Sequence, residues 1–400
     1  MDVKALRNDF PILQKQSLTY LDTAASSLTP KCVIDRMNEY YYEYPVNVHR
    51  GVYQLSFKAT EHYMNARQTI ANLIHADFEE IVFTRGASSA LNLVASSYGL
   101  NHLKAGDEII VSELEHHSHL LPWQNVAKKT QATLKYVPLN QEGRITVENF
   151  KSVLTKKTKV VALTYISNVM GYETPLKDII QLAHAQGALV SVDAAQAIPH
   201  KKVDVKDLDC DFLSFSGHKM CGPTGIGVLY GKKHLLEAMA PIEFGGDMND
   251  HVNLYDAEFK ETPYKFETGT PPIAEAIGLS EAVNYLVNIG FDKIYQHENK
   301  LKSLALSELA KIQGITVYNK TTETGIINFN LDGVHPHDAV SFFDQDHIAL
   351  RAGHHCAQLV SRFLGVQSTL RASLHLYNTL EDCNRLIDGV QKAKQFFESF

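Results

Sequence analysis

The sequence is poor in cysteine and has no cysteine pair with the spacing of a redox or metal motif. Its 400 residues contain five cysteines, which are Cys32, Cys210, Cys221, Cys356 and Cys383. None forms a CxxC motif, so neither a disulfide framework nor a zinc knuckle is predicted. In a reducing compartment each cysteine must then be interpreted singly, as a residue of the core or as a nucleophile.

The sequence also lacks excess positive charge and long apolar runs. Its formal net charge is -7 at pH 7, which argues against nucleic acid or an anionic membrane as a main partner. The start, MDVKALRNDF, carries charges where a signal peptide has its apolar core, and no uncharged span is long enough to cross a bilayer. We therefore expect a cytoplasmic protein with no nucleic-acid partner and no membrane.

Short apolar strands alternate with helices through the middle of the chain. Strands are expected at 81–84, 108–112, 160–166, 188–192 and 212–216, with helices at 90–98 and 123–130 among them. This alternation predicts a mostly parallel sheet that helices cover on both faces. Past residue 278 the pattern changes to α+β, and 400 residues exceed the usual size of one core. We expect a large α/β domain at 19–288 and a smaller α+β domain made of 1–18 and 289–400.

A single lysine, Lys219, follows the apolar strand at 212–216 and stands among glycines. Lysine is normally a surface residue, and a lysine that solvates a loop is the commoner explanation of such a position. A lysine held at a strand end inside a cleft has a lowered pKa, however, and is a candidate nucleophile or Schiff-base former. Ligands of open α/β sheets bind outside the carboxyl ends of the strands, so the other strand ends bear on this choice.

Two other strand ends carry polar residues that suit a charged ligand. After the strand at 81–84, Gly86, Ala87 and Ser88 open a helix with free N–H groups. This is typical of an anion site but also of ordinary helix capping. After the strand at 108–112, histidines stand at 116, 117 and 119. They are either metal ligands or, at least as plausibly, include a ring that stacks on an aromatic group and exchanges protons.

The strand at 188–192 ends in Asp193, which is followed by Gln196. A carboxylate after so apolar a run is partly buried and needs a cation or an N–H partner, and a structural ion pair is the alternative explanation. Together, these strand ends supply a phosphate cradle, a stacking histidine, a buried carboxylate and an amine. Pyridoxal 5'-phosphate requires this set, with the lysine for covalent attachment and the carboxylate to keep its ring nitrogen protonated.

A series of motifs, spread in order from residue 20 to residue 378, carries a family resemblance. They are YLDTAA, NVHRG, TRGASSALNLVA, ELEHHSHLLPWQ, SNVMG, SVDAAQ, FSGHKMCGPTGIGVLY, FETGTP, RAGHHCAQ and LRASLHLYNT. With them the sequence resembles the fold-type I pyridoxal-phosphate enzymes of the class V aminotransferase group, and most of all the group II (Suf-type) cysteine desulfurases. The resemblance implies a homodimer, a mostly parallel seven-stranded sheet in the large domain and a smaller α+β C-terminal domain.

The resemblance also implies roles for matching positions. Lys219 holds the cofactor, Asp193 pairs with its ring nitrogen, and Gln196 bonds its phenolate oxygen. His116 stacks on the ring and shuttles protons. The implied phosphate ligands are Gly86, Ala87 (through its N–H alone, where many relatives have a hydroxyl), Ser88, Ser216, His218 and, from the neighbouring subunit, Thr270. The implied substrate-binding residues are Arg371, Asn168, Arg351, His49 and Arg50.

Cys356 distinguishes a desulfurase from other members of this group. It ends the run RAGHHC at 351–356, in which two adjacent histidines are expected to act as cations and favour the thiolate. In a desulfurase this thiolate attacks the sulfur of L-cysteine, and L-alanine and an enzyme persulfide result. Core packing is the alternative role, for which a polar glycine–histidine loop is a poor place. The other four cysteines are interpreted as structural, and no metal site is predicted.

The resemblance further implies a sulfur-acceptor protein of the Suf system, zinc-bearing in some relatives, and delivery of sulfur to iron–sulfur clusters. His337 is either a surface histidine at a helix start or, as we hypothesise, a residue that faces this partner. The alternative activities are those of a selenocysteine lyase and of a class V aminotransferase without sulfur transfer. A scaffold without catalysis is a further alternative, against which the presence of Lys219 and Asp193 argues.

Overall fold

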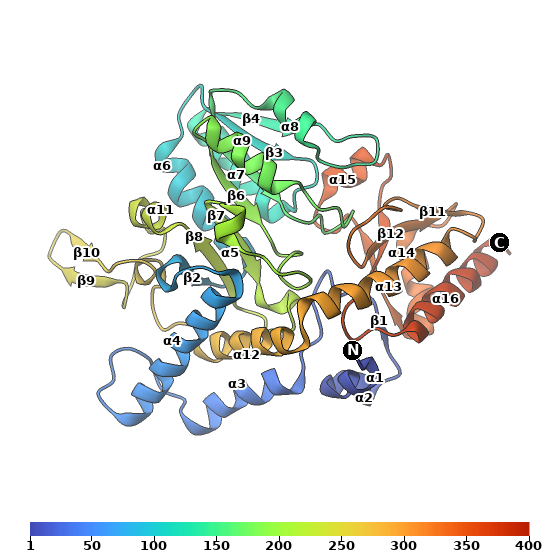
Figure 1. The fold of residues 1–400 in the computed structure, drawn as a ribbon, viewed down its shortest axis with the longest axis horizontal. Helices are drawn as coiled ribbons and strands as arrows, with labels where there is room; N and C mark the ends of the chain where they lie inside the picture. Colours follow the sequence, from blue (N-terminus) through green and yellow to red (C-terminus); the bar gives the residue numbers. More distant parts are fainter. Residues whose placement is uncertain (400) are drawn as a thin grey trace.

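The computed structural model describes residues 1–399 and contains a large and a smaller β-sheet, each packed against its own helices (Figure 1). The large sheet has seven strands in the order β2-β8-β7-β6-β5-β3-β4. Strand β8 is antiparallel to its neighbours β2 and β7, and the remaining pairs are parallel. The strands are β2 (Ile81–Thr84), β3 (Glu108–Ser112), β4 (Thr133–Val137), β5 (Thr158–Thr164), β6 (Leu189–Asp193), β7 (Phe212–Ser216) and β8 (Gly227–Gly231). The expected mostly parallel seven-stranded sheet is confirmed.

Both faces of the large sheet are buried, because neighbouring residues of a strand point into opposite cores. On β3, Ile110 belongs to a core that includes residues of α4 (Gln54–Ile74), α9 (Leu176–Ala185) and α12 (Ile273–Ile289). Val111 belongs to a second core, with residues of α5 (Ala87–Val94) and α7 (His117–Thr130). Helices therefore cover both faces, as the strand–helix alternation predicts.

Two of these helices differ from the sequence expectation in where they begin. Helix α5 begins at Ala87 and passes at Ala95 into a π-helical turn that ends at Gly99. Helix α7 begins at His117 and contains Pro122, although the pattern predicts a start after this proline. Pro122 is the sixth residue of the helix, so it leaves the Ser118 carbonyl without its usual N–H partner within the helix. Both starts lie beside the candidate site described below.

The smaller sheet has the order β11-β12-β15-β14 and is antiparallel throughout. Its strands are β11 (Ile315–Val317), β12 (Ile326–Leu331), β14 (Arg351–Gly353) and β15 (Thr369–Ser373). Helices α13 (Phe291–Leu309), α14 (Pro336–Gln345) and α16 (Leu380–Glu398) contribute to its separate hydrophobic core. Helices α12 and α13 meet at Gly290, whose φ of 93° suits glycine. The division into domains near this point stays a prediction.

The N-terminal segment crosses from its first helices to the smaller sheet. Strand β1 (Thr19–Tyr20) pairs in parallel with β13 (Ile348–Ala349), and Asp22 forms a parallel bridge with Ser373. A hairpin of β9 (Asn249–Val252) and β10 (Ala257–Phe259) projects from the molecule (Figure 1). The remaining helices are α1 (Val3–Leu6), α2 (Pro11–Lys15), α3 (Lys31–Glu43), α6 (Leu100–His102), α8 (Val147–Val153), α10 (Val205–Leu208), α11 (Lys233–Ala238) and α15 (Gln358–Phe363). Within residues 1–399, no helix combines the length and the apolar character needed to span a bilayer.

Candidate active site

A cavity of about 450 Å³ lies at the carboxyl ends of β6 and β7, where residues of the smaller sheet also border it. The predicted site residues that line it are Lys219, Asp193, His116, Ala87, Ser88, Ser216, His218, Asn168, Arg351, Cys356 and Arg371. They come from strand ends, helix starts and loops that are far apart in the sequence. The fold thus places one lysine, one buried carboxylate and one cysteine in a single cavity.

Lys219 lies at the end of β7, on a single 3₁₀ turn formed by Gly217–Lys219. The turn is fixed by the N-terminal segment, because the Ser27 N–H donates to the His218 carbonyl at 2.8 Å. Burial lowers the pKa of the Lys219 amine, and the nearby Asp193 carboxylate opposes this effect. An amine with a lowered pKa has a larger neutral fraction, which is the form that attacks a carbonyl.

Asp193 and His116 border the cavity close to Lys219. Asp193 is buried at the end of β6, and its Oδ1 accepts a hydrogen bond from the Ala195 N–H at 3.0 Å. His116 is the N-cap of α7, where its Nδ1 accepts from the Ser118 N–H at 3.1 Å. Burial, followed by the Lys219 charge, lowers the pKa of His116 to about 4. The ring is therefore neutral at pH 7 and carries its proton on Nε2.

The start of α5 forms a polar cradle beside these groups. The Ala87 N–H donates to Ser216 Oγ at 2.7 Å, and the hydroxyls of Ser88 and Ser118 lie 2.6 Å apart. Gly227 permits this arrangement, since a Cβ there would lie 2.4 Å from the Gly86 Cα. Helix N–H groups and hydroxyls suit a phosphate. With the amine of Lys219 and the carboxylate of Asp193, this donor set fits pyridoxal 5'-phosphate.

Cys356 is exposed, and its loop has an unusual backbone conformation. Both His355 and Cys356 are left-handed, with φ values of 52° and 54°, which costs free energy for residues other than glycine. Two hydrogen bonds hold the loop, because the His117 N–H donates to the Cys356 carbonyl at 2.7 Å and Asn168 Nδ2 donates to the His355 carbonyl at 2.6 Å. The loop thus depends on residues of the large sheet and its helices.

Arg371 lies on β15 and is almost fully buried. Its Nη1 donates to the Asn168 carbonyl at 2.8 Å, and its Nη2 lies 3.3 Å from Asp22 Oδ1. Burial lowers the pKa of Arg371 to about 10, so the guanidinium remains charged at pH 7. A buried guanidinium beside an amide is suited to bind a substrate carboxylate.

The aminotransferase class-V family matches residues 19–386. The chain belongs to this family. Probable cysteine desulfurases of Halalkalibacterium halodurans and Staphylococcus epidermidis are 50% and 49% identical to it; each match covers 99% of this chain, and 99% and 98% of the relatives. The structure of the cysteine desulfurase CsdA from Escherichia coli matches with a TM-score of 0.94 and 40% identity over 99% of both chains. A cysteine desulfurase from Thermococcus onnurineus NA1 matches with a TM-score of 0.94 and 39% identity, over 99% of this chain and 98% of that one.

These comparisons confirm the class-V aminotransferase family, the fold type and the similarity to cysteine desulfurases.

In this class-V member, however, one expectation about Cys356 is wrong. His355 is not a cation, because burial, followed by the Arg371 charge, lowers its pKa to about 3. The cations that interact electrostatically with Cys356 are Lys219, Arg351 and Arg371. The positive charge near the thiol thus comes from Arg351, five residues earlier in the same run, and from two residues that are distant in the sequence.

Several expected site residues do not line the cavity of this chain. Gln196 is buried next to it and donates through Nε2 to the carbonyl of Ala24, which does line it. Thr270 lines a second cavity, of about 570 Å³, which shares Ser88 with the first. His49 packs against Tyr63 and Tyr264, and Arg50 is paired with Asp247. Within one chain the structure therefore does not bring Thr270, His49 and Arg50 to Lys219.

Asp22 is a cavity residue that sequence reasoning missed. Its carboxylate accepts from Arg351 Nε at 3.0 Å and from Arg351 Nη2 at 2.9 Å, in addition to its contact with Arg371. The only sequence signal was its place in the motif YLDTAA, where the aspartate looks like an ordinary residue after a strand.

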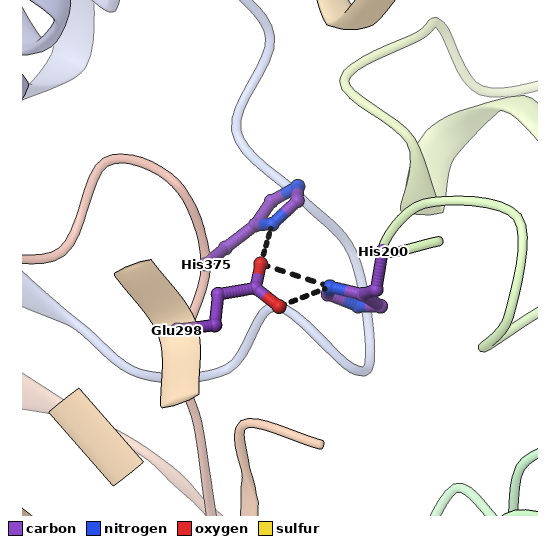
Figure 2. A group of neighbouring side chains, drawn as sticks. All are labelled: His200, Glu298 and His375. Atoms are coloured by element: carbon purple, nitrogen blue, oxygen red, sulfur yellow. Dashed lines mark hydrogen bonds and ion pairs between the residues drawn. The ribbon is translucent and has the colours of Figure 1, made fainter. Parts of the chain in front are cut away.

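A buried cluster of His200, Glu298 and His375 was also missed (Figure 2). The Glu298 carboxylate lies 2.9 and 3.0 Å from His200 Nδ1 and 2.7 Å from His375 Nδ1. These are hydrogen-bond distances, whereas two ligand atoms on one tetrahedral zinc ion lie about 3.3 Å apart. Burial alone would raise the pKa of Glu298, but the two histidines hold it at about 2. The contacts describe a clasp, held by hydrogen bonds to the Glu298 carboxylate, between three segments of the chain.

Proposed function

We propose that this chain is a pyridoxal-phosphate-dependent cysteine desulfurase. It converts L-cysteine to L-alanine and keeps the sulfur as a persulfide on Cys356. The observation that carries the proposal is the presence of an exposed cysteine in the same cavity as Lys219, Asp193 and Arg371. A transaminase needs the amine, the carboxylate and the arginine, but it has no use for this thiol.

The side chains around the cofactor have separate tasks. Lys219 would hold the cofactor covalently, Asp193 would keep its ring nitrogen protonated, and Gln196 would bond its phenolate oxygen. The start of α5, from Gly86 to Ser88, binds the phosphate together with Ser216 and His218. When bound, pyridoxal 5'-phosphate withdraws electrons from the α-carbon of the substrate.

Arg371 and Asn168 bind the α-carboxylate, with Arg351 beside them. Lys219 would remove the α-proton, because burial lowers the pKa of its amine. His116 is neutral with its proton on Nε2, so this N–H can donate a hydrogen bond near the substrate sulfur or carbon. The tautomer of His116 is fixed because the Ser118 N–H donates to its Nδ1.

The sulfur transfer belongs to Cys356. Its thiolate attacks the substrate sulfur, a new S–S bond forms, and the Cβ–S bond breaks with its electron pair left on the carbon side. A proton added at Cβ and the return of the α-proton by Lys219 then complete L-alanine, and the persulfide remains on Cys356. The positive charges of Lys219, Arg351 and Arg371 interact with Cys356.

The proposal includes a homodimer. Thr270 is the neighbouring subunit's phosphate ligand, and His49 and Arg50 are substrate-binding residues that we assign to the partner's cavity. Thr270, His49 and Arg50 lie outside the cavity of their own chain, which supports the assignment to a partner. Ser88 lines both cavities, which places the second cavity next to the first. The large groove lined by Thr270 is then covered by the second subunit.

The sulfur passes to an acceptor protein of the Suf type and then to iron–sulfur clusters. We propose that His337 faces this acceptor, because it is exposed and its ring stacks with that of His335 at the start of α14. The protein acts in the cytoplasm, which fits its free cysteines.

The test is to incubate the purified holoenzyme with L-cysteine and to measure alanine, sulfide and a persulfide on Cys356. In Cys356→Ala we expect alanine formation from L-cysteine to fall by at least about 100-fold. Cys32→Ala is the matched control and keeps full activity, since Cys32 does not line the cavity. Keto acid in place of alanine would identify an aminotransferase. If Cys356→Ala acts on selenocysteine but not on L-cysteine, the site also has selenocysteine lyase activity. If the wild type turns over no substrate, a scaffold without catalysis is favoured.

A further inference from the structure

The three histidines near the start of α7 contact different partners. His116 borders the cavity and accepts from the Ser118 N–H, whereas His117 Nε2 accepts from the Gln358 N–H. His119 does not line the cavity, and its side chain is 0% exposed. The proposed reaction gives His119 no task, so its buried contacts need a separate explanation.

A buried carboxylate, that of Glu115, connects the end of β3 with the first turn of α7. Its Oε1 accepts from Ser112 Oγ at 2.6 Å, and its Oε2 lies 2.8 Å from His119 Nδ1. Ser112 Oγ in turn accepts from the Leu114 N–H at 3.1 Å. Glu115 is buried, so water has little access to these hydrogen bonds. Each carboxylate oxygen thus has a protein partner, one before and one after His116 in the sequence.

These hydrogen bonds fix the chain on both sides of His116. Ser112 ends β3, and the His119 N–H donates to the His116 carbonyl at 2.9 Å as the helix begins. The backbone of His116 is therefore held from both directions, and its ring is held by the Ser118 N–H. Glu115 does not line the cavity, so it acts on the cavity only through His116.

His119 also connects the start of α7 with the strand that ends in Asp193. Its Nε2 lies 3.4 Å from Ser191 Oγ, on β6. Alternate residues of a strand share a face, so Ser191 and Asp193 point to the same side of the sheet. Hydrogen bonds thus link the element that carries His116 to the strand that carries Asp193. This chain of hydrogen bonds, the Glu115 network, consists of Ser112, Glu115, His119 and Ser191.

We propose that Glu115 and His119 are positioning residues that set the place of His116 relative to Asp193. The proposal rests on the proposed function, in which His116 stacks on the cofactor ring and Asp193 pairs with the ring nitrogen. These two residues must meet one rigid ring, so their relative position matters. A misplacement of about 1 Å costs on the order of 100-fold in rate. A buried network with a partner on each carboxylate oxygen restricts such movement.

The first test is Glu115→Gln in the holoenzyme. Glutamine keeps the shape of the side chain, but it has one acceptor oxygen where the carboxylate has two, so either Ser112 or His119 loses its acceptor. We expect the visible circular dichroism of the bound cofactor to lose intensity, because this signal depends on the groups packed against the ring. The kcat for L-cysteine should fall about tenfold, while KM stays within about twofold. An unchanged visible dichroism would overturn the proposal.

A pair of variants at His119 tests the hydrogen bond to Glu115 even if Glu115→Gln folds poorly. His119→Asn keeps an N–H near the place of Nδ1, whereas His119→Leu has no polar atom in its side chain. We expect His119→Leu to lose visible dichroism and rate, and His119→Asn to recover most of both. Equal losses in the two variants, or no loss in either, would contradict the positioning role.

Asp211→Asn is the matched control, because Asp211 is another buried carboxylate that pairs with a histidine. Its Oδ2 lies 2.8 Å from His184 Nε2. Asp211 directly precedes β7, whereas the cavity lies at the carboxyl end of this strand. We expect Asp211→Asn to lower the Tm without changing the visible dichroism. If it reduced the dichroism as much as Glu115→Gln, the signal would report general loss of stability and the specific role would be refuted.

The dichroism is measured without substrate, which separates this proposal from the proposed function. If the wild type forms alanine and sulfide but Glu115→Gln has an unchanged spectrum, the positioning role alone is refuted. If the wild type forms no sulfide but the spectrum of Glu115→Gln changes, the desulfurase activity is refuted and the positioning role is supported.

Discussion

At the residue scale, burial decides which side chains carry charge in the cavity. His116, His218 and His355 all have pKa values lowered by burial, to about 4, 4 and 3, and are neutral at pH 7. The expectation that the histidine next to Cys356 is a cation failed because adjacency in sequence says nothing about burial. Lys219, Asp193 and Cys356 could be found from sequence because strand ends and motifs mark them.

The buried His355 should make the protein sensitive to acid. A histidine with a folded-state pKa near 3 and an unfolded value near 6.5 binds more protons when unfolded, so its contribution to stability is present above pH 6.5 and falls as the pH drops toward 3. Between pH 6.5 and pH 5, the free energy of unfolding should fall by about 1–2 kcal/mol less in His355→Gln than in the wild type. Urea unfolding at both pH values measures this difference.

The exposed His337 provides the control for this acid effect, because His337→Gln should follow the wild type at both pH values. An identical acid loss in His355→Gln and the wild type would show that this buried ring does not drive the pH dependence.

At the element scale, the large sheet could be predicted because its strands are apolar, short and separated by helices. The small residues at 86–88 also indicated the start of α5, whereas that of α7 could not be predicted, since its histidines and Pro122 give no apolar period. Both starts border the candidate site, the first with its N–H groups and hydroxyls and the second as the anchor of the Cys356 loop. The loop is held because the Gln358 N–H donates to His117 Nε2 at 3.1 Å, beside the backbone bond from His117 to the Cys356 carbonyl.

The His117 ring should therefore position Cys356 without binding substrate. Burial lowers the pKa of His117, so its Nε2 is available as an acceptor. In His117→Ala the Gln358 N–H loses this acceptor, and we expect persulfide formation in a single turnover to slow about tenfold. The KM for L-cysteine should stay the same, since His117 does not line the cavity.

Rescue separates this positioning role from a general loss of structure. His117→Gln offers an oxygen near the place of Nε2 and should recover most of the rate. A change in KM of the same size as the change in rate, or no rescue by glutamine, would argue against a specific role for the ring.

At the scale of the whole molecule, the site exists because elements of both sheets are held together. Asp22 joins the N-terminal segment to the smaller sheet, and the clasp joins the loop that follows Asp193 and Gln196 to α13 and to the loop after β15 (Figure 2). Sequence could not reveal the clasp, because Glu298 lies 98 residues from His200 and 77 from His375. Its effect is to fix the loop that carries Asp193 and Gln196 relative to β15, which carries Arg371.

The clasp should matter for stability and should do so without a metal ion. Glu298 is buried and its charge accepts from two imidazoles, so Glu298→Gln should lower the free energy of unfolding by about 2–4 kcal/mol. Glu323→Gln, which disrupts the more exposed pair with Arg144, should cost less than about 1 kcal/mol. Because direct hydrogen bonds hold the cluster, EDTA should leave the Tm of the wild type unchanged. A Tm that falls with EDTA in the wild type but not in Glu298→Gln would instead place a metal between the two histidines.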